Sequence, residues 1–191
     1  MERLSANSSE PYATQLAACS VRSRVAFLLA LAERASAEIE AEEGVAGRIR
    51  VALDFAWRWE EVGDVSGDAL YESVDGSPYN LDDDDGINEH MVTANQKFMV
   101  FTIMSALLYT SWHAYIAVGD RVFPEPVCEV GEEDIDQAID YARQMPVGFN
   151  QVAVDRLAQY CIANHKAADD KDLGEPISRE TMMQVADWTS A

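Results

Sequence analysis

Apolar residues recur at helical spacing along most of the chain. Val25, Leu28 and Ala32, for example, follow one another at steps of three and four residues. This spacing places apolar side chains on one face of an α-helix. We therefore expect a single helix over residues 12–42, which the glycines at 44 and 47 bring to an end.

A second helix is predicted over residues 46–62. On a wheel of about 100° per residue, four charged residues share one arc and are expected to form an exposed ladder of opposite charges: Arg50, Asp54, Arg58 and Glu61. Glu60 instead falls inside the apolar arc. Either it reaches solvent because the helix ends at Gly63, which we favour, or it pairs with a group on a neighbouring helix or on a partner.

Residues 98–118 form the most apolar stretch, without a single Asp, Glu, Lys or Arg. Although a segment of this length can span a bilayer, its second half is rich in Tyr, Trp and hydroxyl side chains and no excess of positive charge flanks it. We therefore expect a central core helix over about 89–119. One stripe of this helix is polar, and its members either form hydrogen bonds between helices in the core or line a groove for a ligand or partner: Thr102, Ser105, Tyr109, Trp112 and His113.

The remaining elements are shorter. Residues 64–74 are expected to form a loop that contains a short helix, and residues 123–126 a rigid connector, because a proline restricts the residue before it. Further helices are predicted after Gly131 and after the capping residues Asn150 and Ser178. The core face of the helix after Gly131 is expected to be Ile135, Ala138, Ile139 and Ala142.

These patterns predict the all-α fold class, because no strand periodicity competes with them. We expect one bundle of about six to eight helices around the central helix. Residues 1–10 are predicted to be a flexible N-terminus, and residues 11–191 a single helical domain.

The charge of the chain is strongly negative, with 34 acidic residues against 14 lysines and arginines. Residues 54–89 contain twelve of the acids and one base, Arg58. Nucleic-acid binding needs clustered Lys and Arg, and anionic membrane surfaces repel acidic proteins, so neither is an expected partner. A basic protein would be attracted. The alternative, that the charge serves only solubility, stays open at this point.

No motif for catalysis or cofactor binding is present, such as a glycine-rich phosphate loop, a His-Glu-x-x-His metal motif or a nucleophile elbow. A calcium-binding loop would place its first and twelfth ligands at Leu81 and Val92, which have no carboxylate. Cys161 and His165 share one helix face, but Cys161 belongs to a core face. We expect no catalytic residue, no metal site and no cofactor, and the three widely spaced cysteines favour a reducing, cytoplasmic location.

Several aromatic and acidic motifs follow one another along the chain: ALDFAWRWE at 52–60, GDALYESVD at 67–75, the aspartates at 82–85, YTSWHAY at 109–115 and FPEPV at 123–127. In this order they resemble the type-six immunity family of bacterial polymorphic toxin systems, over roughly residues 24–145. A more distant similarity links Ala32-Glu33-Arg34 to an all-helical bacterial family of unknown function. The tail after Gly148 has no counterpart in either.

The resemblance implies an all-helical protein that inhibits a cognate toxin made by the same strain, a toxin encoded beside it. A basic, nuclease-type toxin would fit an acidic surface. The alternatives are a helical adaptor with a different partner and, less favoured, a helical-bundle metal enzyme. The candidate partner-binding residues are Glu60, Asp64, Asp68, Tyr71, Glu72, Asp75, Tyr79, Asp82, Asp83, Asp84, Asp85, Glu89 and Tyr115, with Tyr71, Tyr79 and Tyr115 expected to be exposed.

Overall fold

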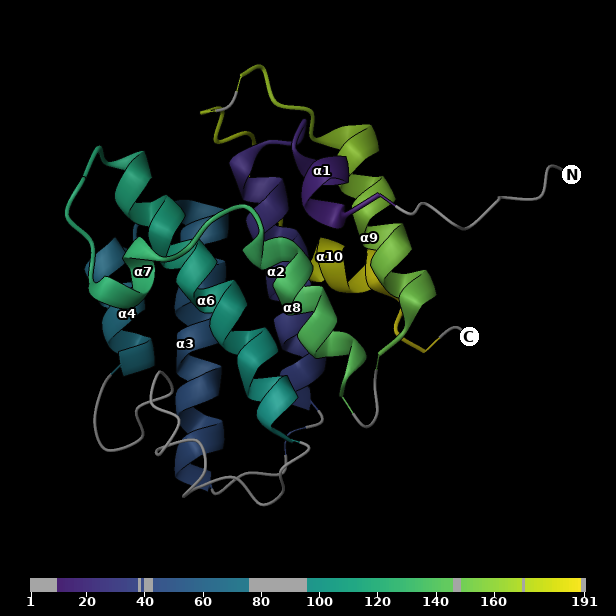
Figure 1. Ribbon diagram of the computed structural model, residues 1–191, viewed down its shortest axis with the longest axis horizontal. Coiled ribbons are helices and arrows are strands. Elements are labelled where there is room, and N and C mark those ends of the chain that lie inside the picture. The colour runs from purple at the N-terminus through teal and green to yellow at the C-terminus, as the bar shows by residue number, and fades with distance from the viewer. Residues whose placement is uncertain are drawn as a thin grey trace, which may run out of the picture.

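Two long helices, α2 (Val21–Ala37) and α6 (Lys97–Ala117), form the centre of the fold (Figure 1). The computed structural model describes residues 10–37, 39, 43–75, 96–145, 149–169 and 171–189. The other helices of these residues are α1 (Tyr12–Leu16), α3 (Glu43–Val62), α4 (Gly67–Asp75), α7 (Glu125–Cys128), α8 (Asp134–Arg143), α9 (Gln151–Asn164) and α10 (Arg179–Ala186). The all-α class is confirmed. Of the predicted flexible N-terminus, residues 1–9 lie outside the described residues.

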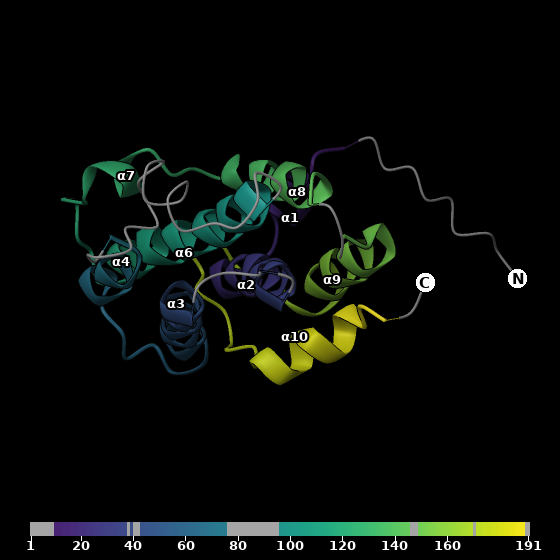
Figure 2. The same cartoon turned by 90° about the horizontal axis from the view of Figure 1, so that it is seen from below.

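The middle of helix α2 is apolar on every face and is enclosed on all sides. Each residue from Val25 to Ala32 is at most 2 % exposed. Figure 2 shows α3, α6, α9 and α10 arranged around this helix, and all four contact it. The sequence predicted one central helix, whereas two share the centre.

The predicted single helix over 12–42 is wrong at residues 17–20, where the chain turns between α1 and α2. The backbone N–H groups of Ser20, Val21 and Arg22 donate to the carbonyls of residues 165, 172 and 173, at 2.9, 3.0 and 3.0 Å. The first N–H groups of a helix have no partner within it. A distant part of the chain therefore supplies the acceptors at the start of α2.

Helix α6 lies at the predicted central position, although residues 89–95 of the predicted range lie outside the described residues. Two members of its polar stripe form hydrogen bonds, one within α6 and one to the segment before α8. The Thr102 hydroxyl donates to the Phe98 carbonyl at 2.8 Å, and the Tyr109 hydroxyl donates to Glu132 at 2.8 Å. None of the described helices, α6 included, has the length and hydropathy of a membrane-spanning segment.

The later helices begin where the sequence predicts. Asn150 Oδ1 accepts the Ala153 N–H at 3.2 Å at the start of α9, and Ser178 Oγ accepts the Thr181 N–H at 3.1 Å at the start of α10. The predicted core face of α8 is buried as well. The connector at 123–126 differs from the prediction, because the short helix α7 begins within it, at Glu125.

The charged ladder predicted on α3 is exposed, but its members bond to other elements instead of to one another. Arg50 pairs with Glu33 of α2 at 3.3 Å, and Asp54 with Arg179 of α10 at 2.8 Å. Glu61 accepts the Arg179 N–H at 2.8 Å. These charges thus connect α3 to α2 and α10.

The prediction that Glu60 reaches solvent is wrong, since its exposed fraction is 0 %. Its Oε1 accepts the backbone N–H of Ile177 at 3.0 Å, and Oε2 has no hydrogen-bond partner among the described residues. Burial raises the pKa of this carboxyl to about 9, against the opposing effects of the Ile177 N–H and the Arg22 charge. The alternative prediction, a group on a neighbouring helix or on a partner, is close to the structure, in which Ile177 lies in the segment just before α10. The buried Glu60 does not belong to the candidate surface.

Candidate protein-docking surface

Helix α4 is held on α6 by contacts at its first two residues. The Ser111 hydroxyl donates to the Gly67 carbonyl at 3.1 Å, and the Tyr115 hydroxyl donates to Asp68 Oδ1. The Tyr115 ring also lies so close to Gly67 that a Cβ there would be 2.6 Å from the ring. Two of the motifs in the sequence, at 67–75 and 109–115, therefore meet in space and fix the direction of α4.

These contacts also correct one predicted exposure. Tyr115 is only 4 % exposed, because its ring packs beneath the start of α4 and against Phe123. It positions Asp68 instead of contacting solvent. Tyr71, the other described tyrosine of the predicted set, is partly buried.

The structure brings four predicted acids together along α4 and the segment before it. Asp68, Glu72 and Asp75 lie at spacings of four and three residues, which places them along one side of the helix. Asp68 and Glu72 are exposed, and Asp75 is partly so. Asp64 lies just upstream and is also exposed. We call Asp64, Asp68, Glu72 and Asp75 the acidic row.

Asp64 of the acidic row pairs with a charged residue of α3, Arg58. Arg58 Nε lies 2.8 Å from Asp64 Oδ1, and this hydrogen bond lowers the pKa of the Asp64 carboxyl. Arg58 is the one base that the sequence places within the acidic region 54–89. The pair connects the end of α3 to the start of the α3–α4 connection.

The remaining candidates follow α4 directly in the sequence. Tyr79, Asp82, Asp83, Asp84, Asp85 and Glu89 lie outside the described residues. Their part in a docking surface stays a prediction from the sequence.

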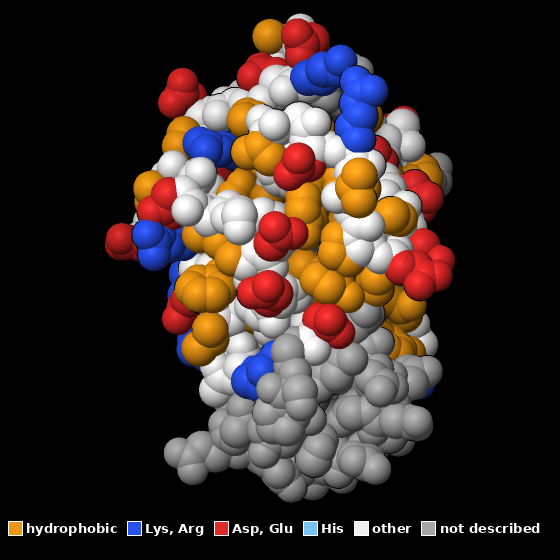
Figure 3. Space-filling model, turned by 90° about the vertical axis from the view of Figure 1, so that its left-hand side faces the viewer, with side chains coloured by type: hydrophobic (Ala, Val, Ile, Leu, Met, Phe, Trp, Pro, Cys, Tyr) orange, Lys and Arg blue, Asp and Glu red, His pale blue; other side chains and the backbone are white. Residues whose placement is uncertain are grey.

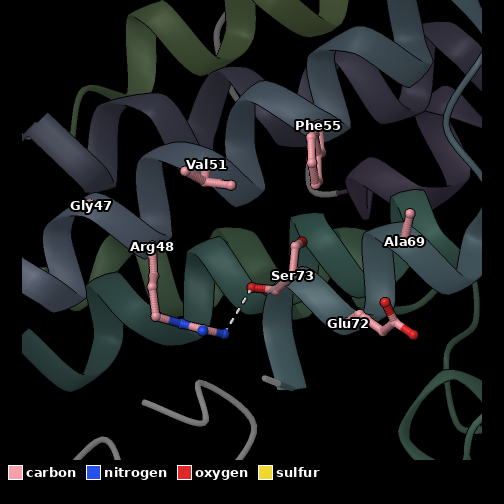
Figure 4. A pocket seen from close by; sticks show the side chains of 7 residues that line it. All are labelled: Gly47, Arg48, Val51, Phe55, Ala69, Glu72 and Ser73. Carbon is pink, nitrogen blue, oxygen red and sulfur yellow. Dashed lines mark hydrogen bonds between the residues drawn. The ribbon is translucent and has the colours of Figure 1, made fainter. Parts of the chain in front are cut away.

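A groove of about 580 Å³ runs between α3 and α4, beside the acidic row (Figure 4). Its lining comes from both helices: Gly47, Arg48, Val51 and Phe55 of α3, with Ala69, Glu72 and Ser73 of α4. Arg48 Nη2 donates to the Ser73 carbonyl at 3.3 Å. Figure 4 shows the Arg48 side chain at one end of the groove and the Glu72 carboxylate toward the other.

The apolar part of the groove is accessible to a partner. Val51 is 51 % exposed and Phe55 is 36 % exposed, and Val62, about two helical turns further along α3, is exposed as well. Figure 3 views the side of the molecule on which α4 and α7 lie, and shows exposed hydrophobic side chains among separated acidic ones. The face thus combines apolar contact area with negative charge.

The sequence analysis missed these apolar residues, although a signal for them exists. At about 100° per residue, Val51, Phe55 and Val62 fall in a narrow arc between the charged and the buried arcs of α3. The apolar side of the helix is therefore wider than the stripe of roughly 100° that one packed face needs. An apolar arc wider than one packed face indicates that part of the apolar surface of the helix is not covered by other elements.

A second cavity, of about 400 Å³, lies near the C-terminal end of α6. Trp112 and His113 of the predicted polar stripe line it together with Glu132 and Lys171. His113 is buried, and burial lowers its pKa to about 3, with the nearby Arg24 charge adding to the effect. Two residues of the stripe thus line a cavity, and a role of this cavity in binding a ligand or partner stays a prediction.

The buried thiols are poor candidates for chemistry. Cys161 is fully buried and its Sγ donates to the Ser23 carbonyl at 3.4 Å. Burial raises the pKa of the Cys161 thiol well above its usual value, whereas a nucleophilic cysteine needs a lowered pKa. In the part of the chain that the structure describes, no three His, Cys, Asp or Glu side chains are grouped so that they could hold a metal ion.

An exposed face that combines apolar contact area with negative charge is typical of proteins that bind other proteins. Comparison with known families is more specific, since residues 23–145 match the family described as immunity protein Imm6. The chain belongs to this family and is therefore an immunity protein, whose partner is a toxin. The matched residues confirm the resemblance predicted over 24–145.

The match covers the chain from the first turn of α2 to the end of α8. Helices α9 and α10 lie beyond it. Neither the curated proteins nor the solved structures contain a match to the chain.

Proposed function

We propose that this protein neutralises its cognate toxin by direct binding, and that the toxin docks on the acidic row of α4 and the connection before it. The observation that carries this proposal is that the exposed Glu72 lines the groove between α3 and α4, with the exposed acids Asp64 and Asp68 shortly before it in the chain. Exposed like charges on one face raise the association rate of an oppositely charged partner. Binding and inhibition require no bond-making chemistry from the immunity protein.

The charge favours a basic toxin of the nuclease type. A nuclease needs positive side chains along the path of its phosphate backbone. An acidic surface can bind these side chains and thereby exclude the substrate. Asp82, Asp83, Asp84, Asp85, Glu89 and Tyr79 are proposed to extend the same surface, and the complex is proposed to form in the cytoplasm.

Co-expression with the toxin gene adjacent to this one tests the function itself. Cells that carry the toxin should stop growing, and the immunity protein should restore growth. If the wild-type protein does not restore growth and does not bind the purified toxin domain, the proposal fails.

The acidic surface is tested by removing charge at two places. Glu72→Gln with Asp75→Asn takes two charges from the acidic row, whereas Asp140→Asn with Glu175→Gln takes two from exposed positions on other elements. We expect the first pair to weaken toxin binding at least about tenfold at low salt and to flatten its salt dependence. If both double variants bind the toxin with the same affinity and the same salt dependence, the acidic row does not bind the toxin. Asparagine at all four of positions 82–85 tests the proposed extension in the same way.

A further inference from the structure

We infer that the groove between α3 and α4 is an anchor pocket for one large apolar side chain of the toxin, which is accompanied by a lysine or arginine that binds at the Glu72 end. This inference rests on the proposed function and adds the chemistry of the occupant. At about 580 Å³ the groove is as large as a typical small-molecule site of roughly 300–1,000 Å³, so it has room for a large side chain together with part of the neighbouring residue.

The apolar half of this assignment comes from the groove's lining. Val51 and Phe55 are both accessible, and Ala69 opposite them on α4 is small. Interfaces derive most of their affinity from a few apolar anchors that fill such pockets and are ringed by polar groups. Here the polar ring consists of Arg48, Glu72 and Ser73.

The lysine or arginine of the occupant is inferred from the positions of the charges around the groove. The Arg48 guanidinium already donates to the Ser73 carbonyl, at 3.3 Å. Glu72 is exposed at the other end, and Asp68 and Asp75 lie on the same side of α4. A cation on the occupant is therefore attracted to the Glu72 end and repelled from the Arg48 end. This difference fixes the direction in which the occupant lies.

A second copy of this chain does not meet these requirements. Each copy has a net charge of -20, and a twofold pairing through this face would place one acidic row opposite the other. Like charges at an interface act against association. The charge of the groove thus selects a basic partner.

The decisive variant introduces a charge on the apolar side of the groove. Val51→Asp is compared with Val152→Asp, because Val152 is on α9 and its exposed fraction of 54 % is close to the 51 % of Val51. The probe is the purified domain of the toxin that the co-expression test identifies. We expect Val51→Asp to weaken binding at least about tenfold, as loss of an anchor does, and Val152→Asp to leave binding unchanged.

A charge reversal tests the other end. Glu72→Lys should weaken binding, whereas Glu175→Lys, at an exposed position before α10, should not. One Lys→Glu or Arg→Glu substitution on the toxin should restore binding to the Glu72→Lys protein and to no other variant. Circular dichroism and the thermal midpoint of each variant establish whether it is folded. If Val51→Asp does not fold, Glu72→Lys alone tests the inference.

The outcomes separate the two proposals. If wild-type protein does not bind the toxin, the proposed function and this inference fail together. If wild-type protein binds, but Val51→Asp binds as tightly as Val152→Asp and no toxin reversal rescues Glu72→Lys, the groove is not the anchor pocket and the proposed function stands.

Discussion

Replacing Glu60 by glutamine should make the protein more stable at neutral and alkaline pH. The native carboxyl has a pKa of about 9, whereas its usual value is 4.5. Between these values the folded state holds a proton that the unfolded state has released. The stability that this group contributes is thus complete below pH 4.5 and is lost as the pH rises toward 9.

The size of the effect follows from the width of this window. Each pH unit within it costs about 1.4 kcal/mol for one proton. From pH 5 to pH 8 the wild-type protein should lose up to about 4 kcal/mol relative to Glu60→Gln, a large fraction of the 5–15 kcal/mol that is typical of a folded domain. The amide also places an N–H₂ group where Oε2 has no partner. The free-energy cost of this unpaired amide is the same at every pH. It therefore does not alter how the stability difference between Glu60→Gln and wild type changes with pH.

Urea unfolding at pH 5, 6, 7 and 8 measures this slope. The difference in unfolding free energy, Glu60→Gln minus wild type, should grow by about 1.4 kcal/mol per pH unit. Glu129→Gln is the control, because Glu129 is exposed, and its difference should stay constant. If the Glu60→Gln and wild-type curves run parallel, the buried carboxyl is ionised at neutral pH and the reasoning is refuted.

Three further predictions concern other parts of the fold. His113 has a pKa of about 3 instead of its usual 6.5, so the stability that it contributes is present above pH 6.5 and is lost as the pH falls; thermal midpoints between pH 4 and 7 should fall less steeply for His113→Gln than for wild type. Gly67→Ala forces a Cβ against the Tyr115 ring and should lower the free energy of unfolding in urea by about 1–3 kcal/mol. Gly47→Ala is the control, because nothing lies within 4 Å of a Cβ there, and it should be neutral or stabilising. Equal effects of the two substitutions would contradict the close packing of Gly67 on Tyr115. A thiol reagent should rapidly label Cys128 alone in the native protein, because the other two cysteines are buried, and labelling of all three at one rate would contradict this burial.

Features that depend on local spacing could be predicted from the sequence. The core face of α8 and the caps of α9 and α10 each depend on residues within a few positions of one another. Side-chain periodicity and the hydrogen bond of a cap are properties of one helix. The structure confirms all three.

Features that depend on a distant partner could not be predicted in this way. Glu60 is buried because the chain near Ile177 supplies its hydrogen bond, 117 residues away in the sequence. The break before α2 depends on acceptors at residues 165–173. Tyr115 is covered because Gly67 lets α4 approach it closely. In each case the position within its own helix carries no information about the segment that covers it.

The same limit applies to the candidate site. The acids of α4 follow directly from the sequence, since a row of carboxylates is visible in any helical projection. The groove beside them exists only where α3 and α4 lie against each other. A helical wheel places its apolar residues, Val51 and Phe55, outside the buried arc of α3, but the distance between two helices cannot be read from either helix alone.

Helices α9 and α10, beyond the matched family region, have a consequence for how the protein can be divided. Arg179 of α10 pairs with Glu33 at 2.8 Å, and the segment before α10 provides the N–H group for Glu60. A chain shortened to residue 145 would take Arg179 from Glu33, which keeps Arg50 and Trp57, and would take the N–H donor from the buried Glu60 carboxyl. One face of α2 would also be open to water. We therefore expect the matched region alone to be less stable than the full chain, so a neutralisation assay should use a chain that includes α9 and α10.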